Sequence, residues 1–297
     1  MSDRADEVDA ARGDLMRVAF RMLGTVADAE DAVQEASVRW LRLTSAQRSE
    51  IVNPAAWLTR TTSRICLDAL DTARARRERY VGEWLPEPIP GGSALVGGSG
   101  RTAEDPLDRL TLDESVNTAL LVVLESLSPA ERVSFVLHDV FGMPFDEIAE
   151  TVGRSSDAVR QLASQARRHV RERRARPVDR VEHDAVAAAF AAACVSGDLD
   201  ALVRILDADV VLRADSDGKR SAARRPVVGA DRVARFMLGL PRLQPTSVIE
   251  PVVTADGLSF LSRTDGEVDA VFSLGVSDGR VTDVWVSRNP EKLRLWS

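Results

Sequence analysis

A proline-rich run followed by glycine pairs divides this chain, and it is the feature that most limits how the chain can fold. Residues 84–90 contain three prolines, and glycine pairs follow at 91–92 and 97–98. Proline lacks a backbone N–H, and glycine disfavours the interior of helices and strands, so no regular element is expected to continue through this stretch. We predict separate units at 1–80 and 106–176, joined by a linker over 81–105 that is stiff first and flexible afterwards.

Composition excludes several classes of protein. The chain has 297 residues, enough for two or three domains, and it has no run near the roughly 18 apolar residues that a membrane span needs. From the acidic, polar start we expect no signal peptide. Two cysteines, Cys66 and Cys194, exclude a disulfide framework, and three widely spaced histidines do not suggest a metal site. We expect a cytoplasmic protein with no metal, cofactor or membrane contact.

The segment before the linker is predicted to be helical. Thr25 and Asp28 have the spacing of a capping box. Apolar residues follow at helical spacing, which predicts one buried stripe: Ala29, Ala32, Val33, Ala36 and Trp40. Another face of the same helix carries an acidic stripe of Asp28, Asp31 and Glu35, with Gln34 beside them.

Basic residues are concentrated in two islands of a chain whose formal net charge is −7. Residues 53–80 hold six arginines against three acidic residues, and residues 154–176 hold eight against two. This pattern predicts nucleic acid bound at two separate places, with solvated helix faces as the alternative. In the first island, Asn53-Pro54 is expected to start a helix. Its outward face is expected to carry Arg60, Ser63 and Arg64, continuing to Arg74, Arg76 and Arg77.

The second basic island follows the pattern of a helix-turn-helix. A capping box at Ser128–Glu131 starts one helix, a short helix over 144–152 ends at Gly153, and a long helix follows Ser155. Arginine can read guanine and glutamine can read adenine, while hydroxyls near a helix start suit phosphate contacts. The residues expected to contact duplex DNA are Ser156, Arg160, Gln161, Ser164, Arg167 and Arg168.

Beyond Pro177 the pattern changes to that of an α+β domain over 178–297. Helices are predicted over 186–195 and 199–206, and β-prone runs over 248–254, 268–276 and 281–286. Asp-Gly pairs at 256, 265 and 278 predict the turns between them. Helices followed by hairpins indicate a separate domain.

Two motifs in the first 176 residues resemble conserved regions of bacterial sigma factors. Residues Ala27–Ala36 with Pro54–Arg60 resemble the second region, and residues 128–174 resemble the fourth. Their order and spacing resemble the extracytoplasmic-function (ECF) group, over about residues 10–175. The resemblance implies two all-α sigma domains, at 1–80 and 106–176, the second with the helix-turn-helix.

The resemblance also implies partners and roles. The acidic stripe Asp28, Asp31, Gln34 and Glu35 would bind the clamp of the largest subunit of core RNA polymerase, and the second sigma domain the flap of the second subunit. The loop at 43–54 and the following helix would bind the minus-ten promoter element, where a pocket for a flipped base offsets the cost of unstacking. The helix-turn-helix would read the minus-thirty-five element, and the acidic linker would thread the polymerase cleft.

Three further motifs resemble the ECF branch that carries a C-terminal SnoaL-like domain of the NTF2 type, a cone of curved sheet and helices. They are Trp84–Pro88, Asp215–Lys219 and Asn289–Leu293; Ser216 and Asp217 stand where a more glycine-rich loop is common. The resemblance implies regulation of the sigma factor in cis. The regulatory candidates are Trp84, Pro86, Asp215, Asp217, Gly218, Lys219, Asn289 and Pro290.

Three alternatives stay open at the level of sequence. The chain could be a conventional helix-turn-helix regulator with a ligand-sensing cone, or an NTF2-like isomerase or hydrolase with a DNA-binding appendage. His183 and Asp184 are adjacent on a helix and are expected to face different directions, a poor acid–base dyad, so we predict no enzyme activity. A small-molecule pocket is the third alternative, against plain core, for Phe236, Phe260, Phe272 and Trp285.

Overall fold

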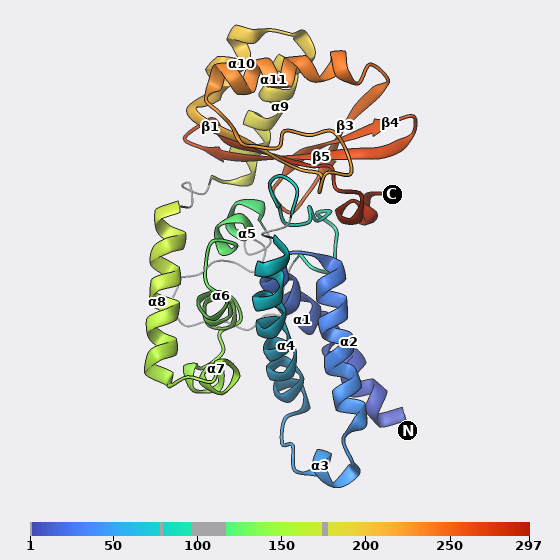
Figure 1. The fold of residues 1–297 in the computed structure, drawn as a ribbon, viewed down its shortest axis with the longest axis vertical. Helices are drawn as coiled ribbons and strands as arrows, with labels where there is room; N and C mark the ends of the chain where they lie inside the picture. The colour runs from blue at the N-terminus through green and yellow to red at the C-terminus, as the bar shows by residue number, and fades with distance from the viewer. Residues whose placement is uncertain (1, 78–79, 97–116, 174–177) are drawn as a thin grey trace. The chain divides into compact units, whose positions relative to one another are not determined.

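The computed structural model describes residues 2–77, 80–96, 117–173 and 178–297 (Figure 1). The described chain forms two compact units, one of residues 2–77, 94–96 and 120–173, the other of residues 80–93, 117–119 and 178–297. The helix expected to resume near 106 lies outside the described residues, and the next described helix begins at Thr118. In the described ranges, no helix has the length and apolar character of a membrane span.

The first unit begins with helices whose caps the sequence predicted. They are α1 (Ser2–Leu23), α2 (Val26–Arg42), the short α3 (Ser45–Ser49) and α4 (Pro54–Arg77). The Thr25 hydroxyl accepts the Asp28 N–H at 3.2 Å, and Asn53 Oδ1 accepts the N–H of Ala56 at 3.1 Å, so orphan donors at both helix starts are satisfied. The predicted stripe from Ala29 to Trp40 is buried, as expected for an amphipathic helix packed on α1 and α4.

The same unit continues with the predicted helix-turn-helix. Before it come α5 (Thr118–Leu124), whose first two residues belong to the other unit, α6 (Pro129–Phe135) and a π-helical turn (Val136–Val140). The helix-turn-helix itself consists of α7 (Phe145–Val152) and α8 (Ser156–Arg173). The capping box of Ser128 and Glu131 is present in both directions. α8 packs on α6 and α7 through its buried stripe: Val159, Ala163, Ala166 and Val170.

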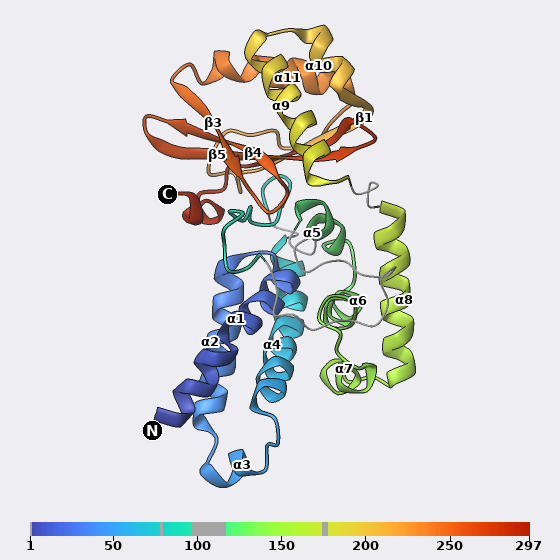
Figure 2. The ribbon, with the colours of Figure 1, turned by 180° about the vertical axis from the view of Figure 1, so that it is seen from behind.

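The second unit contains a six-stranded sheet covered on one face by helices (Figures 1 and 2). The chain passes through α9 (Arg180–Ser196), α10 (Leu199–Ile205), β1 (Leu206–Asp215), β2 (Val227–Val228) and α11 (Ala230–Leu243). It continues through β3 (Ser247–Val253), β4 (Leu258–Thr264), β5 (Glu267–Ser277) and β6 (Arg280–Ser287), and it closes with the 3-10 turns η3 (Pro290–Lys292) and η4 (Arg294–Trp296). The strand order is β2-β1-β6-β5-β4-β3, in which only the β1–β6 pair is parallel.

The α+β prediction for this unit is confirmed, with elements missed. The predicted strands correspond to β3, β5 and β6, while β1, β2, β4 and α11 were not predicted. Two predicted turns have positive φ at Asp265-Gly266 and Asp278-Gly279, which suits tight hairpins. β1 was missed because Asp207 and Asp209 interrupt its apolar pattern, and a register shift lies between Leu206 and Val211.

Of the two alternatives for the four aromatic residues, plain core is confirmed for three of them. Phe260 pairs with Phe272, which pairs with Val286, and these side chains belong to the core under the helices together with the partly buried Phe236. Trp285 pairs instead with Ser273, one residue along both strands. Because successive side chains of a strand point to opposite faces, Trp285 lies on the other face of the sheet.

Candidate functional site

The acidic stripe of α2 is exposed and largely free of internal partners. Asp31 and Gln34 are exposed, and the side chain of neither makes an ion pair or a hydrogen bond to any residue that the structure describes. Asp28 is half-buried and accepts the hydroxyl of Thr25 at 2.6 Å, so it also serves as a cap. Glu35 forms an exposed pair with Arg39 at 2.9 Å. Asp31 and Gln34 are therefore the members of the stripe most available to a partner.

The α4 face differs in part from the predicted one. Arg60 is half-buried and pairs with Glu150 of α7, and Arg64 is exposed. The placement of Ser63 on the outward face was wrong: its side chain is buried and its hydroxyl donates to the carbonyl of Thr59 at 2.7 Å. A buried hydroxyl needs a partner, and the carbonyl four residues back supplies it. The side chains of Arg74, Arg76 and Arg77 lie outside the described structure.

A glycine in the left-handed backbone conformation makes the sharp turn of the helix-turn-helix. Gly153 ends α7 with φ +69°, a conformation that costs other residues about 1–2 kcal/mol, and its N–H donates to Ala149 at 2.9 Å. The Ser155 hydroxyl then accepts the N–H of Ala158 at 3.3 Å and caps α8. These local contacts set the start of α8 relative to α7.

The predicted DNA-reading face of α8 is exposed over most of its length. Arg160, Gln161, Ser164 and Arg168 are exposed. Arg160 lies over the Phe145 ring, 5.5 Å from its centre, and pairs with Asp157. Two other residues of the predicted set are engaged internally.

Arg167 and Ser156 are the two engaged residues. Arg167 Nε lies 3.3 Å from Asp139 of the π-helical turn and 3.4 Å from the carbonyl of Ala163. Ser156 is half-buried, and its hydroxyl oxygen is buried without a hydrogen-bond partner in the described structure. Both residues face the body of the unit more than the predicted pattern implied.

A buried arginine, missed by the sequence reasoning, links the two halves of the first unit. Arg132 of α6 pairs with Glu125 and donates to the carbonyl of Arg21 in α1 at 3.4 Å. Complete burial lowers the pKa of the Arg132 guanidinium, with a smaller opposing effect from the nearby Cys66. Arg21 lies 5.6 Å from the centre of the Phe141 ring. The sequence signals no such role, because Arg132 follows a capping box as an ordinary first-turn residue.

In the second unit, three segments distant in sequence meet at the carboxylate of Asp215. Lys292 Nζ lies 2.7 Å from Asp215 Oδ2, and the Leu85 N–H donates to the same oxygen at 2.9 Å. The Tyr80 hydroxyl donates to Oδ1. Asp215 is fully buried and Lys292 nearly so, which explains why the carboxylate has a donor on each side.

Aromatic rings and an amide complete this cluster. Lys292 Nζ lies 4.0 Å from the centre of the Trp84 ring, a cation–π distance, and also donates to the Leu85 carbonyl. Asn289 Nδ2 donates to the Tyr80 oxygen at 2.9 Å. Burial, followed by the Asp215 carboxylate, raises the pKa of the Tyr80 hydroxyl above its usual value, so the group remains a donor.

The rest of the linker segment 80–93 also binds to this unit. Ala255 N–H donates to the Ile89 carbonyl at 3.0 Å, and Gly91 N–H donates to Val253 at 2.9 Å. The Trp296 indole donates to the Pro88 carbonyl at 2.9 Å. The stiff part of the predicted linker, which includes Pro86, is thus a bound segment of the second unit.

The Asp215–Lys219 loop is held beside the Asn289–Leu293 motif. Lys219 pairs with Asp217 at 3.1 Å and with Glu291 at 2.8 Å. The hydrogen bond to Glu291, opposed by desolvation and aided by Asp217, raises the pKa of Lys219. Asp217 and Gly218 both have positive φ, which confirms a turn there. Asn289 caps η3, which begins at Pro290.

Of the predicted regulatory residues, the structure brings Trp84, Asp215 and Asn289 into one cluster. Tyr80, Leu85 and Lys292 were missed as members of the cluster. Lys292 and Leu85 lie within the motifs that the sequence analysis named. Lys292 is also one of only two lysines in a chain rich in arginine, and this rarity could have indicated its role. Nothing in the sequence marks Tyr80 except that it is the single tyrosine.

The expectation that His183 and Asp184 face apart was wrong. His183 Nδ1 lies 3.1 Å from Asp184 Oδ1, while its Nε2 contacts the Leu274 carbonyl at 3.1 Å. Burial works to raise the pKa of Asp184, but hydrogen bonds from the Leu258 N–H, His183 and Arg180 lower it below its usual value. These contacts tie α9 to the sheet and leave neither His183 nitrogen free.

Neither cysteine is poised for thiol chemistry. Burial raises the pKa of both Cys66 and Cys194 to about 12, and the effect of Arg132 on Cys66 is a smaller, opposing one. A thiol of that pKa is almost entirely protonated near neutral pH. Within the described ranges, no group of histidine, cysteine, aspartate and glutamate side chains could hold a metal ion.

Comparison with known proteins agrees with this arrangement. Residues 8–76 match Sigma-70 region 2, and residues 117–170 match Sigma-70, region 4. The ECF RNA polymerase sigma factor SigJ of Mycobacterium tuberculosis is 40% identical over 96% of this chain and 92% of that protein. The probable ECF RNA polymerase sigma factor SigI of the same species is 39% identical over 97% of this chain and 95% of that protein.

A crystal structure extends the similarity to three dimensions. That of the Mycobacterium tuberculosis extracytoplasmic function sigma factor SigJ has a TM-score of 0.72 at 38% identity, covering 97% of this chain and 98% of that one. The similarity therefore includes the C-terminal α+β domain, with its six-stranded sheet and helices. A whole-length match of this kind favours a sigma factor over a conventional helix-turn-helix regulator. The chain belongs to the extracytoplasmic-function RNA polymerase sigma factors, which bind core RNA polymerase and promoter DNA.

Proposed function

We propose that this sigma factor is regulated in cis by its C-terminal domain, which controls transcription initiation by holding the linker segment 80–93. The observation that carries the proposal is the Asp215 carboxylate, which accepts from Leu85 N–H, Lys292 and the Tyr80 hydroxyl. Two of these donors come from the linker segment, so one buried group holds that segment on the domain.

The physical basis of the proposal is competition for one segment. In an active sigma factor the linker would thread the polymerase cleft, as the family resemblance implies. A segment bound to the C-terminal domain by buried hydrogen bonds and the Trp84–Lys292 contact cannot occupy that cleft at the same time. Release of the segment should therefore favour initiation, and its retention should oppose initiation.

Run-off transcription with core polymerase tests this proposal. Asp215→Asn keeps the shape of the side chain but weakens its hold on Lys292 and Leu85, so the yield of transcript should rise several-fold. Asp209→Asn is the matched control, because Asp209 is exposed on the same strand, β1. An unchanged or lower yield for Asp215→Asn, with equal binding of core polymerase, counts against regulation through this segment.

We also propose which surfaces meet the polymerase and the promoter. The exposed α2 residues Asp31 and Gln34 suit the clamp of the largest subunit, with Asp28 and Glu35 beside them, and the flap of the second subunit would bind the second sigma domain. Arg60 and Arg64 of α4 suit the minus-ten element. The exposed α8 residues suit the minus-thirty-five element: Arg160, Gln161, Ser164 and Arg168.

We propose, finally, that the chain acts in the cytoplasm and catalyses no reaction by itself. Support comes from His183, whose two ring nitrogens both contact internal partners and so offer no free acid or base. Incubation of the purified chain with epoxide and 3-ketosteroid substrates, assayed for product, tests the second part of this proposal.

A further inference from the structure

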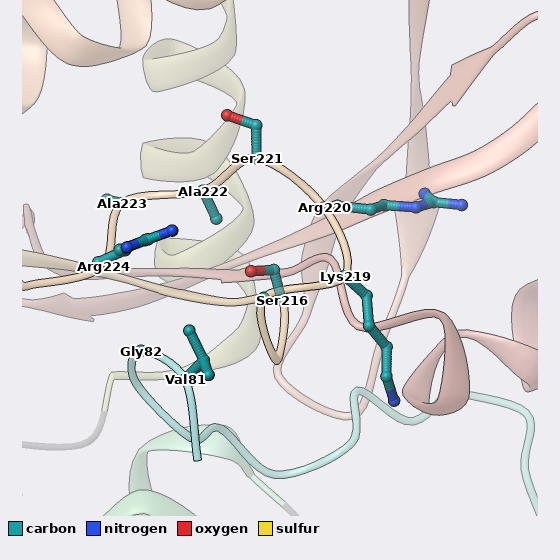
Figure 3. A pocket seen from close by; sticks show the side chains of 10 residues that line it. Val81, Gly82, Ser216, Lys219, Arg220, Ser221, Ala222, Ala223 and Arg224 are labelled. Atoms are coloured by element: carbon teal, nitrogen blue, oxygen red, sulfur yellow. The ribbon is translucent and has the colours of Figure 1, made fainter. Parts of the chain in front are cut away.

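An open cavity of about 340 Å³ lies in the second unit beside the Asp215–Lys219 loop (Figure 3). Val81 and Gly82 of the linker segment form one side, and residues between Ser216 and Arg224 form the other. The volume is at the lower end of the range of small-molecule sites. No role derived above uses this cavity.

The three basic side chains that line the cavity are not equivalent. Lys219 pairs with Asp217 and Glu291, and Arg220 pairs with Asp269 at 2.9 Å. Arg224 is exposed and makes no ion pair or hydrogen bond with any residue in the described ranges. Arg224 is thus the lining cation whose charge has no counterpart.

A second unpartnered polar group faces the same space. Ser216 is only 7% exposed, yet its hydroxyl makes no hydrogen bond to a residue that the structure describes. Figure 3 shows the side chains of Ser216 and Arg224 directed toward one another across the cavity, whereas Lys219 and Arg220 point away. The Ser216 hydroxyl is therefore available as a donor to a group that enters the cavity.

These groups define the chemistry of a ligand. A guanidinium presents a planar fork of donors that fits a carboxylate or phosphate, and a serine hydroxyl adds one more donor. The Val81 side chain, with Ala222 and Ala223, forms an apolar wall next to these donors. We propose that this cavity binds a small organic oxyanion, a carboxylate or a phosphate monoester with a short apolar body, through Arg224 and Ser216.

A ligand in this site would touch both segments that the proposed regulation uses. A Cβ built on Gly218 would lie 3.1 Å from Val81, so the loop and the linker segment are already in close contact at the cavity. Given the regulation in cis proposed above, the bound oxyanion would strengthen the hold on the linker segment and lower initiation. The binding site itself does not depend on that regulation.

Isothermal titration of the full-length chain tests the site. The probes are hexanoate, hexyl phosphate and inorganic phosphate, with hexanol as a probe that lacks the oxyanion. We expect saturable binding of hexanoate or hexyl phosphate, no binding of hexanol, and weaker binding of inorganic phosphate. The tighter of the two organic probes identifies the ligand as a carboxylate or as a phosphate monoester.

Two neighbouring arginines provide the variant and its control. Arg224→Gln should weaken binding about tenfold or more, while Arg225→Gln, an exposed residue outside the cavity, should leave it within about twofold. Thermal melting checks that both variants are folded. The proposal is overturned if no oxyanion binds saturably, if Arg224→Gln retains full affinity, or if Arg225→Gln loses as much.

A transcription assay separates the site from the regulation. If the probe binds through Arg224 but does not lower transcript yield, the site stands and its coupling to initiation is wrong. If Asp215→Asn fails to raise transcription while binding persists, only the proposed regulation fails.

Discussion

The ammonium of Lys292 lies 2.7 Å from Oδ2 of Asp215, although 77 residues separate them along the chain. Both side chains are buried, and the Trp84 ring lies beside the ammonium. A buried pair of this kind contributes little net stability over an apolar replacement, but it is costly to break. Its main effect is to specify which segments meet in the folded domain.

Breaking this pair should destabilise the second unit strongly. Lys292→Met leaves the Asp215 carboxylate buried without its cation, so the free energy of unfolding should fall by about 3–5 kcal/mol. Urea unfolding followed by tryptophan fluorescence measures the loss. The exposed pair of Arg235 with Asp231 is the control, and Arg235→Ala should leave the midpoint nearly unchanged. Adding Asp215→Leu to Lys292→Met should recover part of the loss, and a strictly additive double variant would contradict the pairing.

Substitutions at two glycines with similar backbone conformations distinguish the effect of backbone strain from the effect of a contact with the linker segment. Gly218 has φ +67° and Gly279 has φ +70°, so alanine at either site costs about 1–2 kcal/mol in backbone strain. Gly218→Ala also brings a Cβ to 3.1 Å from Val81, whereas Gly279→Ala meets no atom within 4 Å. We expect Gly218→Ala, but not Gly279→Ala, to increase proteolytic cleavage within residues 80–93. Equal cleavage of the two variants would show that the contact with Val81 does not hold the linker segment.

The exposed arginines of α8 should determine promoter affinity. Arg160→Ala with Arg168→Ala removes two groups able to contact bases or phosphates, each worth about 1–3 kcal/mol, while leaving core binding intact. Footprinting of the reconstituted holoenzyme on a promoter selected with the wild-type protein measures this loss. Arg204→Ala with Arg232→Ala makes the same change of charge on exposed residues of the C-terminal domain and should have little effect. Full occupancy by the α8 variant would remove this helix from promoter recognition.

The unpartnered polar residues Asp31 and Gln34 of α2 should determine core binding. Asp31→Ala with Gln34→Ala removes exposed side chains that have no internal partner, so folding should be unaffected and retention on immobilised core polymerase should fall several-fold. Glu30→Ala, an exposed acid of the same helix outside the stripe, should be retained like the wild type. Equal retention of all three proteins would exclude this surface.

The ion pair of Arg60 with Glu150 should compete with promoter DNA. If Arg60 contacts the minus-ten element, Glu150→Gln frees it and should raise open-complex formation. The rise should be at most about fivefold, because the side chains of Arg60 and Glu150 are 42% and 62% exposed and such pairs are weak. Permanganate footprinting measures the opened bases. Glu147→Gln makes the same change of charge one turn earlier on α7 and should have no effect. An equal rise of open-complex formation in that variant would show that the net charge of α7, and not the release of Arg60, is the cause.

The local features of this chain could be predicted because their causes lie within a few residues. Thr25, Asn53 and Ser128 cap the helices they precede, Gly153 makes the turn before α8, and Asp278-Gly279 closes a hairpin. Hydrogen bonds between residues two to four apart do not depend on the rest of the fold. Helical spacing likewise predicted the buried stripe of α2.

The residues that sequence reasoning misplaced all depend on long-range neighbours. Ser63 follows the helical spacing of an exposed position but is covered by its unit, and Trp285 is placed by its register with Ser273. Adjacent His183 and Asp184 meet because Asp184 turns toward the Leu258 N–H of β4. The helical or strand periodicity of a sequence predicts which residues share a face of the element, but not which other segments cover that face.

By itself, the sequence determined the order of the two sigma regions, the helix-turn-helix and the exposed charged faces of α2 and α8. Only the tertiary structure decided that Tyr80, Leu85 and Lys292 converge on Asp215 and that residues 80–93 are a bound segment. The physical reason is the range of the interactions. Caps and periodic stripes are local, whereas a buried carboxylate takes its donors from whatever distant segments the sheet and its turns bring within hydrogen-bond distance.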